Sequence, residues 1–151
     1  MKLDLRPVLE EDFPTICEIE QRTFIDPWPA EAFTDFLCRN SWLLQLEDKV
    51  IGYIFYHAAI DEAVIINFAI DPEYQRQSYG QQLLAETMQK LLNNGVRYFY
   101  LDVRRSNYKA IALYHKMGFQ SLGFRKDYYH QPQEDAVVMG LEIPAEDAEK
   151  E

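Results

Sequence analysis

The stretch from Asn67 to Gln81 has the residue order of an anion site at the start of a helix. It reads NFAIDPEYQRQSYGQ, in which a run rich in branched residues leads into a polar loop that closes on Gly80, where a long helical pattern begins. At such a junction the backbone N–H groups and the helix dipole point toward one anion, and Arg76 adds a positive side chain. The loop predicts a phosphate site, although a plain strand-to-helix connection has the same outline.

A second stretch, LDVRRSNYKAIALYHKMGF, combines an acid, an amide and a phenol. Asp102 alternates with Leu101 and Val103 on a strand with a buried pattern, where an acid needs a reason. Asn107 and Tyr114 lie seven residues apart, two helical turns, and therefore share a face. An Asn amide can hydrogen-bond an amide-rich ligand, and a Tyr hydroxyl can protonate a departing thiolate. The alternative is structural, with Asn107 capping the helix and Tyr114 packed in the core.

The elements that position these residues alternate between strand-like and helix-like patterns. Strands are predicted for residues 3–8, 41–47, 49–60, 62–70, 96–105, 119–129 and 135–143. Helices are predicted for residues 10–24, 30–38, 80–94 and 106–117, with the HQPQE stretch as the last turn. This order predicts an α/β (α+β) fold with one mixed, mainly antiparallel sheet flanked by helices.

The composition predicts a single domain. The chain has 151 residues, 48% of them hydrophobic, which suits one domain over residues 1–143 followed by an acidic, disordered tail over residues 144–151. The sequence has neither an apolar run of about 18 residues nor an N-terminal hydrophobic segment, so we expect a cytoplasmic protein without a membrane span.

The cysteine and histidine residues predict neither a disulfide framework nor a metal site. Cys17 and Cys38 lack the paired spacing of a zinc site and are expected to be free thiols. His57, His115 and His130 show no ligand spacing with acids or thiols.

Charge is unevenly distributed along the chain. The net charge of -10 argues against a general nucleic-acid binder. Residues 1–74 carry 15 acids and 5 bases, whereas residues 97–126 carry seven bases and one acid. The pattern predicts a cationic partner for the first half and an anionic ligand for the basic segment. A solvated charge pattern without a partner remains the alternative.

The two chemical stretches together with DAVVMGLEI resemble the GNAT superfamily of acetyl-coenzyme A dependent N-acetyltransferases. Within it, the chain is similar to the RimI-like ribosomal-protein-alanine N-acetyltransferases, through EIEQRTFIDPWPAEAF, LDVRRSN, ALYHKMGF and RKDYYHQPQEDAVVM. The resemblance spans Leu5 to Ile143. It implies the GNAT fold and the transfer of an acetyl group from acetyl-CoA to the α-amino group of a protein, most specifically the N-terminal alanine of a small-subunit ribosomal protein.

The resemblance also implies roles for individual residues. Asp102 takes the position of the general base and Tyr114 that of the general acid. Acetyl-CoA is expected to contact the strand end, the pyrophosphate loop and one asparagine: Phe68, Ala69, Ile70, Arg76, Gln77, Ser78, Tyr79, Gly80, Gln81 and Asn107. Backbone N–H groups of that strand end would stabilise the oxyanion.

Two residues depart from the family pattern. Ser78 replaces the first glycine of the loop, which costs little if its φ is negative and about 1 kcal/mol if its φ must be positive. Asp102 stands where the group usually has Glu. Because it is one methylene shorter, we expect it to reach the substrate amine through a water.

The acidic first half suits a basic peptide, such as the N-terminal arm of a ribosomal protein. Trp28, Glu31, Tyr128 and Tyr129 are candidates to line its channel, with core aromatics and a solvated acid as the alternative. Two rival functions stay open. One is acetylation of another amine, such as a lysine side chain, a polyamine or an antibiotic, and the other is a non-catalytic coenzyme A binding module.

Overall fold

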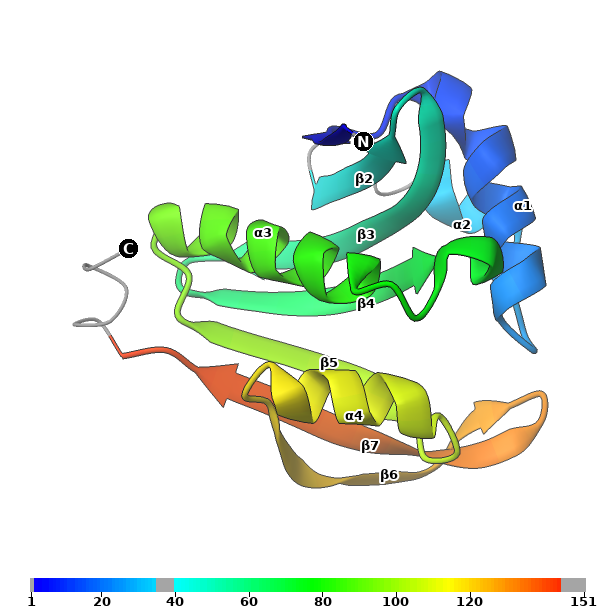
Figure 1. Cartoon of the computed structure of the whole chain (residues 1–151). Coiled ribbons are helices and arrows are strands. Elements are labelled where there is room, and N and C mark those ends of the chain that lie inside the picture. The colour runs from blue at the N-terminus through cyan, green and yellow to red at the C-terminus, as the bar shows by residue number, and fades with distance from the viewer. Residues whose placement is uncertain (1, 35–39, 145–151) are drawn as a thin grey trace. The chain divides into compact units, whose positions relative to one another are not determined.

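The computed structural model describes residues 2–34 and 40–144 (Figure 1). The end of the predicted second helix, residues 35–38, and residues 145–151 of the predicted tail lie outside this part. Seven strands are described: β1 (Leu3–Arg6), β2 (Ser41–Leu46), β3 (Lys49–Ala59), β4 (Glu62–Ile70), β5 (Tyr98–Arg104), β6 (Gln120–His130) and β7 (Gln133–Glu142). The helices are η1 (Glu10–Asp12), α1 (Phe13–Thr23), α2 (Ala30–Thr34), η3 (Pro72–Tyr74), α3 (Tyr79–Asn93) and α4 (Tyr108–Lys116).

The strands form one sheet in the order β1-β2-β3-β4-β5-β7-β6. The β1–β2, β2–β3, β5–β7 and β6–β7 pairs are antiparallel, and β4–β5 is parallel. A parallel pair needs a crossover connection, which α3 supplies between β4 and β5. The predicted fold class, a mixed and mainly antiparallel sheet flanked by helices, is confirmed. No helix among the described residues is long and apolar enough to cross a membrane.

The chain divides into two compact units. The first unit contains residues 1–56 and 67–87, and the second contains residues 57–66 and 88–151. The strand end and loop predicted for acetyl-CoA, residues 68–81, fall in the first unit. Asp102, Asn107 and Tyr114 fall in the second.

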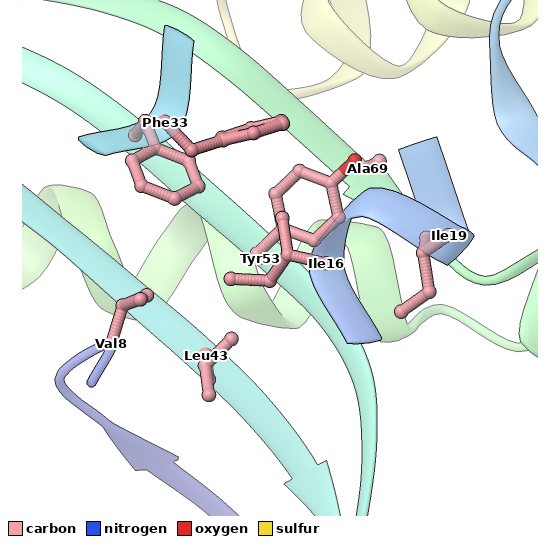
Figure 2. Close-up of a cluster of buried hydrophobic side chains, with 8 residues drawn as sticks. Val8, Ile16, Ile19, Phe33, Leu43, Tyr53 and Ala69 are labelled. Atoms are coloured by element: carbon pink, nitrogen blue, oxygen red, sulfur yellow. The ribbon is translucent and has the colours of Figure 1, made fainter. Parts of the chain in front are cut away.

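The first unit is built on a core of aliphatic and aromatic side chains. Its fully buried members are Val8, Ile16, Ile19, Phe33, Leu43, Tyr53, Phe55 and Ala69. In Figure 2, Ile16 and Ile19 on α1 are drawn with Leu43 and Tyr53 on the strands. The Phe33 ring lies 5.3 Å from the Phe55 ring and 6.2 Å from the Tyr53 ring. The apolar face of α1 thus packs against buried residues of β2 and β3.

Helix α1 begins later than the sequence predicts. Residues 10–12 form the short 3-10 helix η1, and α1 starts at Phe13. Pro14 explains the boundary, because a residue without an N–H fits only the first turn of a helix. Cys17, on this helix, is a free thiol as predicted, and burial raises its pKa. Cys38 lies outside the described residues.

In the first unit, Gly52 lets β3 approach the end of β4. A Cβ atom at this position would lie 2.9 Å from the carbonyl oxygen of Ala69 and 2.5 Å from Cδ1 of Ile70. Both distances are shorter than van der Waals contact allows. The glycine therefore fixes how closely the strand end packs on its neighbour.

In the second unit, β5 alternates between a buried and a half-exposed face. Phe99, Leu101 and Val103 are buried, whereas Asp102 belongs to the other face. The predicted five-residue HQPQE turn is wrong in length. His130 pairs with Gln133, so the ladder continues to a two-residue turn.

Candidate active site

In the first unit, the end of β4 presents its backbone in a defined direction. The parallel ladder with β5 runs only from Glu62–Tyr98 to Ile65–Leu101. Asp71 N–H donates to the Ile51 carbonyl of β3 at 2.7 Å. Because successive residues of a strand face opposite edges, the backbone groups of Phe68 and Ile70 point to the edge away from β3, and those of Ala69 point toward it. Of the three predicted strand residues, Phe68 and Ile70 are therefore the ones whose N–H groups point away from β3.

Asp71 anchors the loop that follows this strand. Its carboxylate accepts two hydrogen bonds from the Arg22 guanidinium, at 2.8 and 3.0 Å, and one from Glu73 N–H at 3.0 Å. Burial alone would raise the pKa of Asp71, but the Arg22 and Glu73 hydrogen bonds outweigh it and hold the pKa below its ordinary value. The side chain of Gln75 reaches back to the Ile70 carbonyl at 2.9 Å. The start of the loop is thus tied to both α1 and β4.

The loop itself is exposed and contains two left-handed residues. Arg76 has φ 65° and Ser78 has φ 67°. Ser78 therefore adopts the positive φ, which costs about 1 kcal/mol more for serine than for glycine. Arg76, Gln77 and Ser78 are exposed to solvent.

Helix α3 starts directly after this loop. The first hydrogen bond at its start runs from Gln82 N–H to the Ser78 carbonyl at 3.1 Å. The N–H groups of Tyr79, Gly80 and Gln81 precede it in the first turn, where helix geometry provides no intrahelical acceptor. Together with the Arg76 charge, this turn offers an anion the donors that the sequence predicts.

In the second unit, Asp102 is neither buried nor alone. Its side chain retains 25% of its exposure, and its Oδ1 accepts a hydrogen bond from Arg125 Nε at 3.1 Å. Across the ladder it faces Val138 of β7. The buried face of β5 therefore contains Leu101 and Val103 but not Asp102. One role of Asp102 is its ion pair with Arg125 on β6.

Asn107 and Tyr114 occupy the two ends of α4. Asn107 caps the helix, with Oδ1 accepting from Ala110 N–H at 3.2 Å. Asn107 Oδ1 thus has the capping role that the sequence analysis gave as the alternative. The amide nitrogen of this exposed residue donates to no acceptor among the described residues. Tyr114 is 7% exposed, with its ring 5.7 Å from that of Phe119. Burial raises the pKa of Tyr114 above its ordinary value, which keeps the hydroxyl protonated at neutral pH.

The candidate peptide-binding residues have different surroundings. In the first unit, Trp28 packs against the core cluster, 5.3 Å from Phe33, and Glu31 is exposed on α2. In the second unit, the Tyr128 and Tyr129 rings meet edge to face at 5.1 Å. Trp28 therefore has the structural role that the sequence left open.

Tyr129 is the more enclosed of the two tyrosines. The Arg104 guanidinium lies 4.3 Å from the centre of its ring. Burial, together with the negative charge of Asp102, raises the pKa of Tyr129 to about 12. Its hydroxyl therefore stays protonated at neutral pH and can donate a hydrogen bond, and it interacts electrostatically with the Asp102 carboxylate.

Sequence reasoning did not identify Glu134, which fixes the turn before α4. Its Oε2 accepts from Ser106 N–H at 2.6 Å, and its Oε1 accepts from Arg104 Nη1 at 3.1 Å. The Ser106 hydrogen bond lowers the pKa of Glu134, and Arg104 adds to this effect. The available signal was an acid at the start of a strand otherwise rich in apolar residues. Glu134 thereby holds the residue next to Asn107.

Among the described residues, no group of three or more His, Cys, Asp or Glu side chains is arranged to hold a metal ion. The first unit offers backbone N–H donors and one guanidinium, and the second offers a carboxylate as an acceptor and a phenol as a donor. This set suits an anionic, amide-containing ligand and acyl transfer.

Comparison with known proteins identifies the family of the chain. The model of the acetyltransferase (GNAT) family matches residues 13–119. The [ribosomal protein bS18]-alanine N-acetyltransferase of Escherichia coli K12 is 37% identical over 136 residues, which cover 87% of this chain and 92% of that protein. The putative [ribosomal protein bS18]-alanine N-acetyltransferase of Bacillus subtilis is 34% identical over 146 residues, which cover 94% of this chain and 97% of that protein.

A solved structure agrees with these relatives. The crystal structure of the ribosomal-protein-S18-alanine N-acetyltransferase from Escherichia coli superposes with a TM-score of 0.87, at 34% identity, and covers 94% of each chain. The chain belongs to the acetyltransferase (GNAT) family and is an acetyl-CoA-dependent N-acetyltransferase.

Proposed function

We propose that this protein acetylates the N-terminal α-amino group of a protein, specifically the N-terminal alanine of a small-subunit ribosomal protein. The observation that carries the proposal is the similarity to the Escherichia coli bS18-alanine N-acetyltransferase over 92% of that enzyme's length. The match to the family model, over residues 13–119, includes both candidate catalytic residues, Asp102 and Tyr114. A ribosomal substrate places the reaction in the cytoplasm.

The residues of the first unit suit the binding of acetyl-CoA. The pyrophosphate is assigned to the first turn of α3 and to Arg76, where N–H groups and one positive charge converge. The acetyl and pantetheine part is assigned to the edge of β4 at Phe68 and Ile70, whose backbone donors also suit an oxyanion. Asn107, in the second unit, adds an amide donor.

Asp102 and Tyr114 are assigned the two proton transfers. The substrate α-amino group, with a pKa near 8, gives up its proton to Asp102, directly or through a water. The amine then forms a C–N bond to the thioester carbon as the C–S bond breaks, and the new amide nitrogen releases its surplus proton to water, from which Tyr114 is reprotonated after the transfer. Tyr114 keeps its proton at neutral pH because burial raises its pKa, and it passes that proton to the departing thiolate. No covalent enzyme intermediate is required.

The acidic first half of the chain supports a basic peptide substrate. Residues 1–74 carry 15 acids and 5 bases, and the net charge of -10 disfavours direct binding of nucleic acid. The partner that this charge selects is the cationic N-terminal peptide itself. The candidates to contact it are Trp28, Glu31, Tyr128 and Tyr129, of which Glu31 on α2 and Tyr128 on β6 are the more exposed.

One experiment separates this proposal from its rivals. The protein is incubated with acetyl-CoA and an alanine-started basic peptide, its N-blocked form, or a free polyamine, and thiol release is followed. Release only with the free N-terminus supports the proposal. Release with the N-blocked peptide or the polyamine supports an enzyme for another amine, and no release supports a coenzyme A binding module.

A further inference from the structure

Glu20, on α1 of the first unit, is a buried carboxylate that the proposed chemistry does not use. Only 1% of the residue is exposed, yet it accepts three hydrogen bonds. Oε1 accepts from the Tyr53 hydroxyl at 2.5 Å and from Asn67 Nδ2 at 2.9 Å. Oε2 accepts from the backbone N–H of Trp28 at 2.9 Å. The three donors come from β3, from β4 and from the segment between α1 and α2.

Hydrogen bonds are the contacts that the described part of the chain provides to this buried carboxylate. Among the described residues, no Lys or Arg side chain lies within ion-pair distance of Glu20. The carboxylate therefore depends on its three donors, and each of them is correspondingly constrained. Tyr53 remains a donor, because burial and the negative charge of Glu20 both raise the pKa of its phenol. A fully satisfied buried network of this kind specifies one arrangement of the surrounding elements.

The donors of Glu20 adjoin two parts of the proposed site. Trp28 is a candidate for the peptide-binding segment, and Asn67 directly precedes Phe68 on the strand assigned to the acetyl group. Both contacts lie within the first unit. We propose that Glu20 is a positioning residue that fixes the Trp28 segment against the end of β4 and so sets the affinity for the peptide substrate. This inference rests on the proposed function.

The variant Glu20→Gln isolates the Trp28 contact. Gln has one acceptor oxygen, and two donors face the Oε1 position, so the oxygen stays with Tyr53 and Asn67. The NH2 group of the Gln side chain then faces Trp28 N–H. Because both groups are donors, the hydrogen bond of Trp28 N–H is lost. We expect the KM for the peptide to rise about tenfold, the equivalent of one hydrogen bond to a charged group. We expect the KM for acetyl-CoA to stay within about twofold, since the strand side of the network is kept.

A second measurement needs no substrate. Hydrogen exchange of the Trp28 amide, followed by NMR in the free protein, should become about tenfold faster in Glu20→Gln, because the acceptor of this N–H is removed. Exchange in β4 should be unchanged. If Glu20→Gln does not fold, Glu20→Asp undergoes the same two measurements, because it keeps the charge but withdraws the carboxylate from its donors.

Asp12→Asn is the matched control. Asp12 is also a buried carboxylate of the first unit, and it also accepts a backbone N–H, that of Leu9 at 2.8 Å, but it contacts neither Trp28 nor β4. This variant should lose stability without changing the KM for the peptide or the exchange of the Trp28 amide. A selective effect of Glu20→Gln is then not a general consequence of destabilising the unit.

The outcomes separate the inference from the function on which it rests. An active wild-type enzyme, together with an unchanged peptide KM and unchanged Trp28 exchange in Glu20→Gln, contradicts the inference alone. Equal rises in both KM values would assign Glu20 a general structural role and also contradict it. A wild-type protein that does not acetylate the peptide contradicts the proposed function, and the inference falls with it.

Discussion

Asp102 and Tyr114, assigned to the two proton transfers, have contrasting surroundings in the second unit. Asp102 lies on the half-exposed face of β5 beside the Arg125 guanidinium, whereas Tyr114 is buried beside Phe119. The Asp102 carboxylate is in contact with solvent, and the raised pKa of Tyr114 keeps its phenol protonated. The environments therefore suit a proton acceptor and a proton donor, respectively.

Replacement of Tyr114 by Phe tests the donor. We expect kcat to fall about 100-fold, the lower end of general acid catalysis, while the KM for acetyl-CoA changes little. Steady-state kinetics with the alanine-started peptide measure both values, and circular dichroism checks the fold. A transfer rate within about twofold of wild type would show that Tyr114 is not the acid.

Ser78 and Arg76 both adopt left-handed φ angles in the loop, which allows a paired test. Ser78→Gly removes the conformational cost, so we expect the free energy of unfolding to rise by up to about 1 kcal/mol and the acetyl-CoA affinity to improve modestly. Arg76→Gly gives the same relief but removes the positive charge, and should weaken acetyl-CoA binding. Thermal unfolding and calorimetric titration measure the two effects. A tenfold weaker acetyl-CoA affinity in Ser78→Gly would overturn this account of the loop.

At the scale of elements, the Arg6–Asp12 pair joins β1 to η1 in the first unit. The Asp12 carboxylate accepts both guanidinium N–H groups at 2.8 Å. The Arg6 hydrogen bond is the main cause that lowers the pKa of Asp12 below its ordinary 3.8. Since the folded pKa lies below the unfolded one, the stabilisation is complete above about pH 4 and is lost as the pH falls through the folded pKa.

The variant Asp12→Asn should make this contribution visible. At pH 7 we expect it to lower the free energy of unfolding by about 2 kcal/mol, because a hydrogen-bonded charge is lost. The difference from wild type should shrink as the pH falls below about 4, where Asp12 of the wild type is itself protonated. Urea unfolding between pH 7 and pH 2 provides the comparison. A difference that stays constant over this range would contradict the assigned pKa direction.

Regular elements could be predicted from the sequence because their patterns are local. The alternation of Phe99, Leu101 and Val103 gives β5, and the apolar face that includes Leu83 and Leu84 gives α3. The sequence does not separate the 3-10 helix η1 from α1, because acids near a helix start suit both. It predicts too long a turn at HQPQE, because polar residues on an edge strand resemble a loop.

The features that cannot be predicted from the sequence depend on contacts between residues that are distant along the chain. Glu20 follows the buried Ile19 on α1, but its donors Tyr53 and Asn67 lie 33 and 47 residues away. The same is true of Glu134, which is 28 residues from Ser106. The sign of the Ser78 φ cannot be predicted from the residue type either, since serine gives no preference for a positive φ, and the family glycine that it replaces allows both signs.

At the scale of the whole molecule, charge is the property most relevant to the substrate. The chain carries a net charge of -10, and residues 1–74 hold all of the excess acid. Long-range attraction between this half and a cationic peptide is screened by salt, with a Debye length near 8 Å at physiological ionic strength. Charge therefore acts on the encounter with the peptide more than on the chemical step.

Salt dependence of the reaction checks this effect. Between about 50 and 300 mM NaCl we expect the KM for a lysine-rich, alanine-started peptide to rise several-fold while kcat changes little. A control peptide with the lysines replaced by glutamine should start from a higher KM and respond weakly. An equal response of the two peptides would mean that the acidic half does not select the substrate.

The central claim is that acetyl-CoA-dependent transfer is directed to a protein N-terminus. Its most direct test is tandem mass spectrometry of an alanine-started peptide that also contains internal lysines, after incubation with the protein and acetyl-CoA. We predict a single acetyl group on the alanine α-amino nitrogen, absent when Tyr114→Phe replaces the wild type over the same time. Acetyl groups on the lysine side chains, with the α-amino group unmodified, would contradict the claim.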